Sequence, residues 1–431
     1  MQSKLSKIEV VGLFGYLKYQ IDDLDTTPVN FIIAKNGMGK TTILKLLQGL
    51  SDNKFEIFRK TDFKSISFTF RNGVEENTIK FFRNEKGKIL WYLKTQENEI
   101  DSKELPYGFW AQADKKRKAA WLEEHTDMVE RAGCGVHWTV NGHGHYNADE
   151  VLNNTTVKQY ISEELTQEDA MNRDFIGDWK AALVTTDRLK KYENDELENV
   201  VNVISGDMVN AMNAHVVEAS QLGQTFEHDF LQKLLNTNGK KPNLDELKKQ
   251  LNEINILEEK VKKYGLYPDT DPIEIPEGNL DAAQLKTLKT FLDDKQARLK
   301  PHIDFLKRLE LFEELVNVSL AQKSIKPDTQ EGIIAERDGQ VQLKLDQLSS
   351  GEQHLIILAH ELIFSIPENT YVLIDEPEIS MHLEWQESFA NMLEKIGELR
   401  NLRFLCATHS PSIVNSRTSE LRPIKLQANV L

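Results

Sequence analysis

Residues 34–42 form a glycine-rich segment, Ala-Lys-Asn-Gly-Met-Gly-Lys-Thr-Thr, whose composition suits the binding of a phosphate chain. Glycine lets the backbone curl so that successive N–H groups point at phosphate oxygens, and a following helix adds its positive N-terminal end. We expect Lys40 to reach the β- and γ-phosphates of ATP and Thr41 to offer its hydroxyl to Mg²⁺, which prefers oxygen ligands. The residues expected to contact the nucleotide here are Asn36, Gly37, Met38, Gly39, Lys40, Thr41 and Thr42.

One residue departs from the usual Gly-x-x-x-x-Gly-Lys-Thr pattern, because Ala34 stands where the first glycine is expected. Alanine fits there if its φ is negative, so we expect nucleotide binding to survive. The alternative is a chance glycine-rich turn. It is disfavoured because an apolar run at residues 29–33 precedes the segment and a helical pattern at residues 41–50 follows it.

A second candidate is the apolar run at residues 371–374, which ends in Asp375 and Glu376. Such a run predicts a buried strand, and open α/β sheets bind ligands at the carboxyl ends of their strands. We expect Asp375 to hold the metal ion through a water, and Glu376 to orient and polarise the water that attacks the γ-phosphate. The alternative is an acidic helix start, which is disfavoured beside a glycine-rich segment of this kind.

Two further segments are weaker signals when each is taken alone. Residues 348–352, Leu-Ser-Ser-Gly-Glu, precede an apolar helical run and are by themselves typical of a helix cap. Residues 404–408 predict another strand, and His409 follows it. A lone histidine at such a position is most often a core or capping residue.

In this order along the chain, the four segments resemble the P-loop, signature, acidic strand and switch histidine of ABC-type ATPases. In that family the signature serine and glycine, matched here by Ser349 and Gly351, contact the γ-phosphate that the opposing subunit holds. The resemblance therefore implies two ATP molecules sandwiched between two cassettes, and it gives catalytic roles to Glu376 and His409. The nucleotide contacts that it implies from the signature are Ser349, Ser350, Gly351 and Glu352.

Within that class the chain is similar to the SMC, RecF and OLD branch, because the 311-residue interval between Lys40 and Gly351 is filled largely by predicted helices. Residues 374–382 resemble the ATPases of bacterial anti-phage systems, AriA of PARIS first and PtuA of Septu next. Residues 185–189 also resemble that branch, which often has glutamine where Asp187 stands, so we assign Asp187 no role.

The elements that must position these residues predict an α/β fold. We expect an ABC-type P-loop ATPase cassette with an antiparallel β layer and a large helical insertion that contains a coiled-coil-like hairpin. The antiparallel layer is predicted by alternating segments at residues 7–11, 65–70, 78–83 and 88–93, with turn residues between the last three. The predicted parts are residues 1–105 and 346–431 for the cassette, 106–170 for an irregular insertion and 171–345 for the helical insertion.

Apolar residues recur every three or four positions between residues 244 and 264 and again between 285 and 299, on either side of a proline-containing turn region. They predict two arms of an antiparallel helical hairpin. Two readings stay open at this point, because the hairpin either protrudes as an interaction arm or packs along its own domain.

Two local clusters have less specific meanings. Cys134, His137, His143 and His145 lie close enough for a metal site, yet their spacing matches no zinc pattern, and a polar hairpin tip is favoured. The basic run at residues 115–118 is either a solvated helix face, which is favoured, or a phosphate-binding patch.

Composition narrows the function classes. No apolar run approaches the roughly 20 residues that cross a bilayer, and residues 1–7 lack the apolar core of a secretion signal, so we expect a cytoplasmic protein. Two cysteines far apart give no disulfide framework. A net charge of −15 weighs mildly against DNA as the main ligand, because nucleic-acid affinity comes largely from Lys and Arg.

The resemblance to the anti-phage ATPases implies a homo-oligomeric ATPase that controls a separate effector nuclease, TOPRIM-type first and HNH-type next, in response to a phage trigger. OLD nucleases carry a TOPRIM domain after the ATPase, whereas 22 residues follow His409 here, so the nuclease is expected on another chain. The alternative is a RecF-like DNA repair ATPase that binds duplex DNA. An energy module for a membrane transporter is disfavoured by the long helical insertion.

Overall fold

The computed structural model describes most of the chain, in segments separated by short gaps. They are residues 3–85, 87–94, 99–104, 115–116, 119, 122–123, 129–131, 137–141, 143–157, 179–185, 190–193, 196–235, 242–271, 273–275, 280–379, 381–414 and 420–423. The chain forms two compact units. Unit 1 comprises Met1–Thr186, Glu368–Glu378 and Asn401–Leu431, and unit 2 comprises Asp187–Pro367 and Ile379–Arg400.

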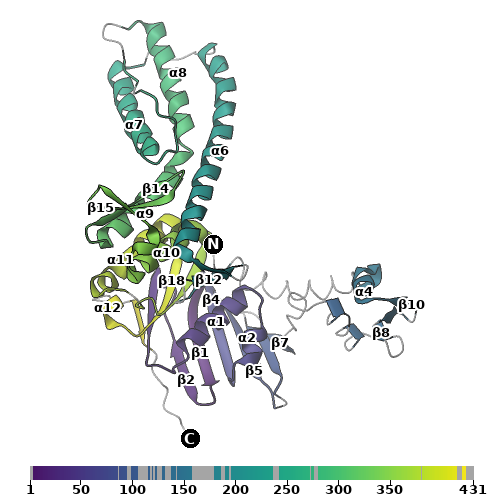
Figure 1. Cartoon of the computed structure of the whole chain (residues 1–431). Coiled ribbons are helices and arrows are strands. Elements are labelled where there is room, and N and C mark those ends of the chain that lie inside the picture. The colour runs from purple at the N-terminus through teal and green to yellow at the C-terminus, as the bar shows by residue number, and fades with distance from the viewer. Residues whose placement is uncertain are drawn as a thin grey trace. The chain divides into compact units, whose positions relative to one another are not determined.

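Unit 1 contains the expected antiparallel layer, a six-stranded sheet of order β2-β1-β4-β5-β6-β7 (Figure 1). Its strands are β1 Lys4–Leu13, β2 Leu17–Ile21, β4 Ser65–Asn72, β5 Glu75–Arg83, β6 Ile89–Lys94 and β7 Glu99–Glu104. Buried and half-buried residues alternate along β1 and β6, as expected for strands with one face turned toward the core. Gly73, at φ 64°, makes the turn between β4 and β5 that the sequence predicted.

The second sheet of unit 1 has five strands, and all of its neighbouring strands are parallel. Its order is β11 Lys180–Val184, β17 Thr370–Asp375, β18 Arg403–Thr408, β3 Val29–Ile33 and β19 Leu421–Pro423. The two central strands β17 and β18 are continuous apolar runs because a parallel sheet is covered on both faces.

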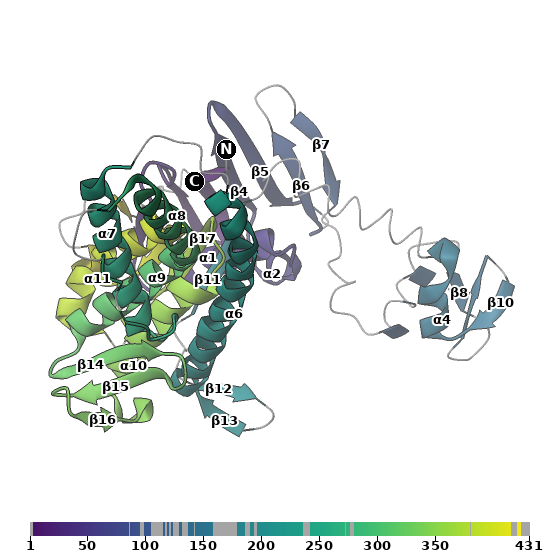
Figure 2. The same cartoon turned by 90° about the horizontal axis from the view of Figure 1, so that it is seen from above.

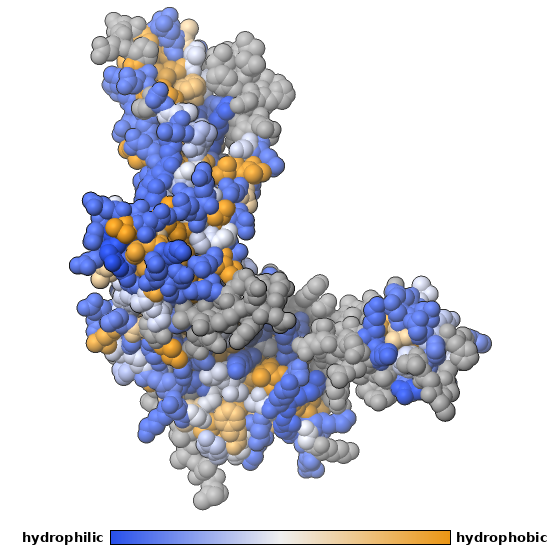
Figure 3. All heavy atoms as spheres, in the orientation of Figure 1, coloured by the Kyte–Doolittle hydropathy of each residue, from blue (hydrophilic) through white to orange (hydrophobic). Residues whose placement is uncertain are grey.

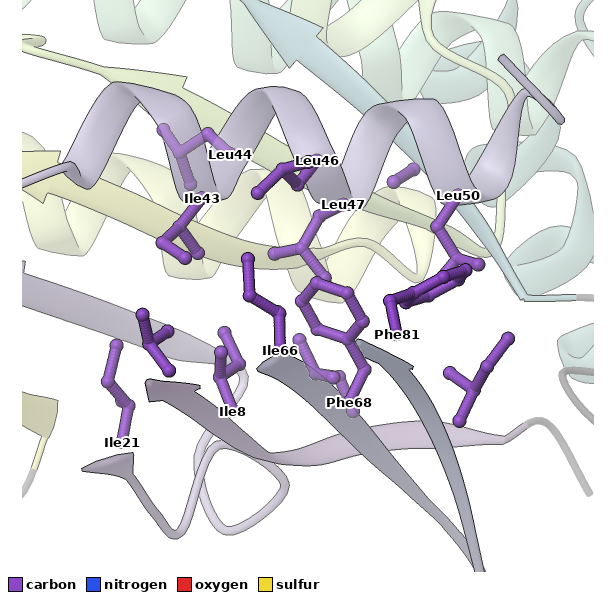
Figure 4. Close-up of a cluster of buried hydrophobic side chains, with 14 of the residues drawn as sticks. Ile8, Ile21, Ile43, Leu44, Leu46, Leu47, Leu50, Ile66, Phe68 and Phe81 are labelled. Atoms are coloured by element: carbon purple, nitrogen blue, oxygen red, sulfur yellow. The ribbon is translucent and has the colours of Figure 1, made fainter. Parts of the chain in front are cut away.

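Helix α1, Lys40–Ser51, joins the two sheets into one core (Figure 4). Its buried side chains meet Ile66, Phe68 and Phe81 of the antiparallel sheet, and Leu373 and Leu405 of the parallel sheet belong to the same cluster. Each such side chain, once fully buried, contributes about 1.5–3 kcal/mol. The hydrophobic core therefore fixes α1, and with it the glycine-rich segment at its N-terminus.

Small elements complete unit 1. They are α2 Glu56–Lys60, α4 Ala148–Asn153, α12 Pro411–Val414 and a three-stranded sheet of β8 Val129–Arg131, β9 Trp138–Val140 and β10 His143–Tyr146. The histidine segment does form a hairpin, since β9 and β10 pair antiparallel, but the prediction that His143 and His145 lie at its tip is wrong because both belong to β10. Cys134 lies outside the described residues, and those described form no group of ligands that could hold a metal ion.

Unit 2 is mainly helical. Its helices are α6 Val200–Leu235, α7 Leu244–Lys263, α8 Ala282–Leu299, α9 His302–Ser319, α10 Ser350–His360 with the π-helical turn Glu361–Ser365, and α11 Leu383–Arg400. Figures 1 and 2 both show α7 and α8 side by side. Their apolar faces form one cluster around Leu251, Ile254 and Leu292, as the sequence predicted.

The predicted antiparallel pairing of α7 with α8 is wrong, because the two helices run parallel. Gln250 in α7 donates to Asp293 in α8 at 2.9 Å. Further along α7, Lys263 pairs with Glu313 in α9 at 2.8 Å, so residue numbers rise together on both sides. The antiparallel neighbour of α8 is α6, which contacts α8 and brings His215 to within 3.1 Å of His302.

The reason lies in the segment between α7 and α8. Its described residues up to 275 return along α7 as a strip, since Thr270 donates to Glu258 at 3.0 Å and the carbonyl of Ile273 accepts from Asn255 at 3.4 Å. Tyr267, with further apolar side chains of the strip, packs against the α7–α8 cluster. The spacing of apolar residues along a helix is the same whichever way the helix runs. The spacing alone therefore could not show that the connecting segment runs back along α7 and leaves α7 and α8 parallel.

The range 171–345, expected to be helical, also contains strands. Besides β11, these are β12 Lys190–Glu193, β13 Glu196–Asn199, β14 Lys323–Asp328, β15 Gly332–Arg337 and β16 Val341–Leu343, with a 3₁₀ turn at Leu345–Gln347. Figure 2 shows β14, β15 and β16 as one sheet. Short strands of mixed polarity give weak periodic signals, and a strand such as β11 draws its stability from its partner β17, which lies far away in the sequence.

The viewed face of the molecule is mostly hydrophilic, with apolar spheres gathered in smaller groups (Figure 3). Among the described residues, no helix is both long enough and apolar enough to span a membrane.

Candidate nucleotide site

The glycine-rich segment connects β3 to α1 in unit 1, as a P-loop does. Gly37 and Gly39 have φ values of 80° and 78°, in the left-handed region that favours glycine. Gly39 is the residue immediately before α1, so the N-terminal N–H groups of the helix follow the loop directly. Ala34 does not have a positive φ, so the condition for alanine at that position is met.

Gly39 is also held by close packing. A Cβ atom at this position would lie 2.5 Å from Cδ2 of Leu13 and 3.5 Å from the hydroxyl of Tyr19. That Tyr19 hydroxyl donates to the carbonyl of Met38 at 3.1 Å, and burial raises the pKa of the phenol above its ordinary value. The antiparallel sheet therefore supports the loop through Leu13 of β1 and Tyr19 of β2. No sequence motif indicated these contacts.

Lys40 is buried, with 6% of its surface exposed. Its Nζ donates to the carbonyl of Ala34 at 2.9 Å and lies 2.7 Å from Nε2 of His409. Burial lowers the pKa of Lys40, and the carboxylates of Glu376, Asp375 and Glu378 act in the opposite direction. The three carboxylates favour the ammonium form but do not fully offset burial, so the pKa of Lys40 stays below its ordinary value.

The acidic strand and the histidine segment meet because β17 and β18 are parallel neighbours that end at the same edge of the sheet. Asp375 lies opposite Ala407. The backbone reverses at Glu376, whose φ of 43° is unusual for a residue other than glycine, and the N–H of Glu376 donates to the carbonyl of Ala407 at 2.8 Å. Its Oε1 lies 3.3 Å from Nε2 of His409, and both side chains remain about one-third exposed.

The residues also fit a bound Mg²⁺ ion. Oδ1 of Asp375 is buried and has no hydrogen-bond partner within the described parts of the chain, so it is available to an ion or its water. Thr41 lies in the first turn of α1 and is half-buried. Carboxylate and hydroxyl oxygens are the ligands that this cation prefers.

The signature lies in unit 2 and forms a helix cap. Ser349 is the N-cap of α10: its hydroxyl accepts from the N–H of Glu352 at 3.3 Å, and its N–H donates to Oε2 of Glu352 at 2.8 Å. Ser349 and Ser350 are exposed and Gly351 is half-buried, so the N-terminus of the helix is open to solvent. The helix cap expected from the sequence alone is present, and it leaves the signature serines accessible.

Glu352 has a different environment from the rest of the signature. Its carboxylate is buried and pairs with Lys323 at 2.8 Å. Burial works to raise the pKa of Glu352, but the hydrogen bonds from Lys323 and Ser349 outweigh it, so the pKa lies below its ordinary value. In this structure the side chain stabilises the start of α10, and its contact with a nucleotide stays a prediction.

The structure thus brings together Lys40, Asp375, Glu376 and His409 in unit 1. Asn36 and Gly37 are exposed on the loop, and Met38 and Thr42 are half-buried beside it. Tyr19 and Glu378 were missed as supporting residues, although Glu378 lies inside the segment whose resemblance was noted. Asp187 lies outside the described residues.

Comparisons with known proteins place the chain in a family. The family model described as AAA ATPase domain matches residues 4–414. The Retron Vc95 probable ATPase of Vibrio cholerae serotype O1 biovar El Tor is 32% identical over 90 residues, which span only 18% of this chain and 17% of that protein.

Solved structures with similarity include two SMC head domains. One, from Pyrococcus furiosus, carries an extended coiled coil and is bound to the C-terminal domain of ScpA; it is 14% identical, with 99% of this chain and 94% of that chain covered and a TM-score of 0.37. The other, from Thermotoga maritima, is 12% identical, with 99% and 100% covered and a TM-score of 0.38. Because the AAA ATPase model extends from before the P-loop to beyond His409, the chain belongs to the family of AAA ATPase domains.

Proposed function

We propose that this chain binds and hydrolyses ATP at a site that a second copy completes, and that its opening and closing control a separate effector. The observation that carries the hydrolytic part is the triad at the sheet edge. Nε2 of His409 lies 2.7 Å from Nζ of Lys40 and 3.3 Å from Oε1 of Glu376. A cation, a carboxylate and an imidazole are thereby gathered beside a phosphate-binding loop.

Each side chain has a distinct part in the proposed reaction. Lys40 neutralises the phosphate charge, and the partly exposed carboxylate of Glu376 orients the attacking water and accepts its proton. His409 can donate a hydrogen bond to the γ-phosphate while it holds Glu376 in place. Thr41 and Asp375 would hold a Mg²⁺ ion, which would further neutralise the charge of the phosphate oxygens.

The second copy enters through the signature. The exposed N-terminus of α10 presents Ser349, Ser350 and the N–H groups of the first helical turn, which suit an anion. In the proposed head-to-tail dimer, this end faces the γ-phosphate bound by the partner's P-loop. Two ATP molecules then hold the two copies together, and hydrolysis releases them. A higher homo-oligomer can be built from the same contact.

The hydrolytic roles are tested with two variants. Lys40→Ala should abolish ATP binding, because it removes the cation that balances the phosphate charge. Glu376→Gln should bind ATP normally and lose turnover by about 10²- to 10⁴-fold, since the amide cannot accept the proton. Glu384→Gln, at an exposed acid in the first turn of α11, is the control. Rapid phosphate release by the Glu376→Gln protein would contradict the assignment.

We further propose that the ATPase belongs to a bacterial anti-phage system. Support comes from the resemblance of residues 374–382 to the ATPases AriA and PtuA, and from the short stretch similar to a probable ATPase of a retron. The partner is then a separate nuclease, TOPRIM-type first and HNH-type next, and a phage protein is the trigger.

This part is tested by expressing the gene with its neighbours and measuring phage plating. Protection that Lys40→Ala abolishes, together with co-purification of a neighbouring nuclease, is the expected result. Salt-dependent binding of duplex DNA by the isolated chain, without a nuclease partner, would instead favour the RecF-like repair function. The net charge of −15 makes that outcome the less favoured one.

A further inference from the structure

We propose that Glu378 is a positioning residue that holds the His409 loop in its active geometry; this inference rests on the proposed hydrolysis at the same site. Oε1 of Glu378 accepts hydrogen bonds from two consecutive backbone N–H groups, His409 at 2.6 Å and Ser410 at 3.2 Å. A carboxylate that accepts from backbone N–H groups makes a stronger bond than a neutral acceptor does. The loop that carries the histidine is therefore tied to the acidic segment by a charged clamp.

The path of the chain explains why this residue can reach the loop. The backbone turns at Glu376, where φ is positive, and Pro377 follows, buried. Glu378 then faces back toward the end of β18. Three hydrogen bonds thus join the two strand ends, one from the N–H of Glu376 to Ala407 and two to Glu378 from the N–H groups of His409 and Ser410. These bonds fix the loop after β17 and the loop after β18 relative to each other, on both sides of the turn at Glu376.

The clamp can position the imidazole because Glu378 holds the backbone N–H of the same residue, His409. In this structure Nε2 of His409 lies 2.7 Å from Lys40 and 3.3 Å from Glu376, and the proposed reaction needs the ring to stay beside Glu376 and the γ-phosphate. A displacement of about 1 Å in such a group can reduce turnover by about 100-fold. We therefore expect Glu378 to affect the chemical step through His409, while the P-loop binds ATP without its help.

The second carboxylate oxygen supports a role beyond a loop cap. Oε2 of Glu378 is buried and has no hydrogen-bond partner among the residues that the structure describes. Burying an unpaired charged oxygen is unfavourable unless a cation lies nearby. Glu378 is one of the carboxylates whose negative charge raises the pKa of Lys40 against the effect of burial.

The experiment compares Glu378→Ala with Glu378→Gln, which keeps the accepting oxygen. Glu378→Ala should lower kcat by about 10- to 100-fold, with the Kd for a fluorescent ATP analogue changed by less than about threefold. Glu378→Gln should recover most of the rate. Hydrogen exchange at the amides of His409 and Ser410 should accelerate in the alanine variant and stay slow in the glutamine variant.

A double-mutant cycle separates positioning from a general effect on folding. Glu378→Ala introduced into a His409→Ala protein should change the residual single-turnover rate by less than about twofold, because the residue acts through the histidine. An unchanged kcat in Glu378→Ala, or unchanged amide exchange, would overturn the inference. If wild type hydrolyses ATP and Glu376→Gln does not, such a result leaves the proposed function standing. If the wild-type chain hydrolyses no ATP at all, the proposed function fails first.

Discussion

At the scale of single residues, two glycines in the same loop face different constraints. Gly37 and Gly39 both have φ near 80°, so any other residue is strained at either position. A Cβ atom at Gly37 would meet no atom within 4 Å, whereas at Gly39 it would lie 2.5 Å from Leu13. Backbone strain and packing can therefore be measured separately in one loop.

We predict that Gly39→Ala weakens ATP binding far more than Gly37→Ala does. Gly37→Ala carries only the left-handed strain, about 1–2 kcal/mol. Gly39→Ala carries the same strain and must also displace the side chain of Leu13, and the displaced loop then loses the bond between Tyr19 and Met38. Nucleotide titration of both variants checks this. Equal losses of affinity would show that the contact with Leu13 is unimportant.

Sequence could identify the residues whose chemistry is fixed by type and spacing. The structure brings Lys40, Glu376 and His409 together as the order of motifs implied, since parallel strands end at one edge. Tyr19 and Glu378 gave no such signal. Both act through hydrogen bonds to or from backbone atoms of other segments, and those partners become neighbours only once the strands have paired.

At the scale of elements, α10 carries the signature at one end and a buried histidine at the other. His360 is 2% exposed, and neither of its ring nitrogens has a hydrogen-bond partner among the described residues. It packs against Phe364, in the π-helical turn that continues the helix, with ring centroids 5.4 Å apart. Burial lowers the pKa of His360 to about 4.

We predict that this histidine makes the protein less stable in mild acid. Its ordinary pKa is 6.5, so below that value the unfolded chain binds a proton that the folded chain excludes. Stability from this site is complete above pH 6.5 and falls as the pH drops toward 4. At pH 5.5 the loss is on the order of 1 kcal/mol.

His360→Leu should remove this part of the acid sensitivity, which denaturant unfolding at pH 7.5 and 5.5 can measure. His382→Leu, at an exposed histidine of the same unit, is the matched control and should retain the wild-type slope with pH. Wild type and His360→Leu losing the same stability between the two pH values would contradict the prediction. His302, whose pKa burial also lowers to about 4, contributes equally to all three proteins.

The elements also show where periodicity reaches its limit. Residues of α7 and α8 that were predicted to be apolar contacts do form one cluster, around Leu251 and Leu292. The predicted antiparallel direction was wrong. The direction depends on whether the connecting segment makes a simple turn or runs back along α7 before α8 begins. The buried pair of Glu258 and Lys295, at 2.6 Å, and the bond from Thr270 to Glu258 hold the returning arrangement. Such side-chain pairs are set by the packed structure and leave no periodic trace.

At the scale of the whole molecule, the P-loop and the signature belong to different units of the chain. Lys40, Glu376 and His409 all lie in unit 1, while Ser349 and Gly351 lie in unit 2. The proposed sandwich assigns each ATP to unit 1 of one copy and unit 2 of the other. A site shared in this way can be rebuilt from two defective copies, provided that their defects lie in opposite halves of the site.

We therefore predict that Lys40→Ala and Ser349→Arg proteins, each inactive alone, regain activity when mixed. In a mixed dimer, the P-loop of the Lys40→Ala copy faces the signature of the Ser349→Arg copy, so one site contains both defects. The other site contains neither defect. Because one of the two sites in a mixed dimer is intact, each mixed dimer should hydrolyse ATP at about half of the rate of a wild-type dimer. Steady-state phosphate release, measured after subunit exchange, provides the test.

Mixing Lys40→Ala with Glu376→Gln provides the matched control for this prediction. Both residues lie in unit 1, so in a mixed dimer each site contains one of the two defects and neither site is intact. Activity recovered with the signature variant and not with Glu376→Gln can come only from a site that two copies share. If neither mixture recovers activity although mixed dimers form, each copy must close its own site, and ATP-driven pairing of copies would have to be abandoned as the switch.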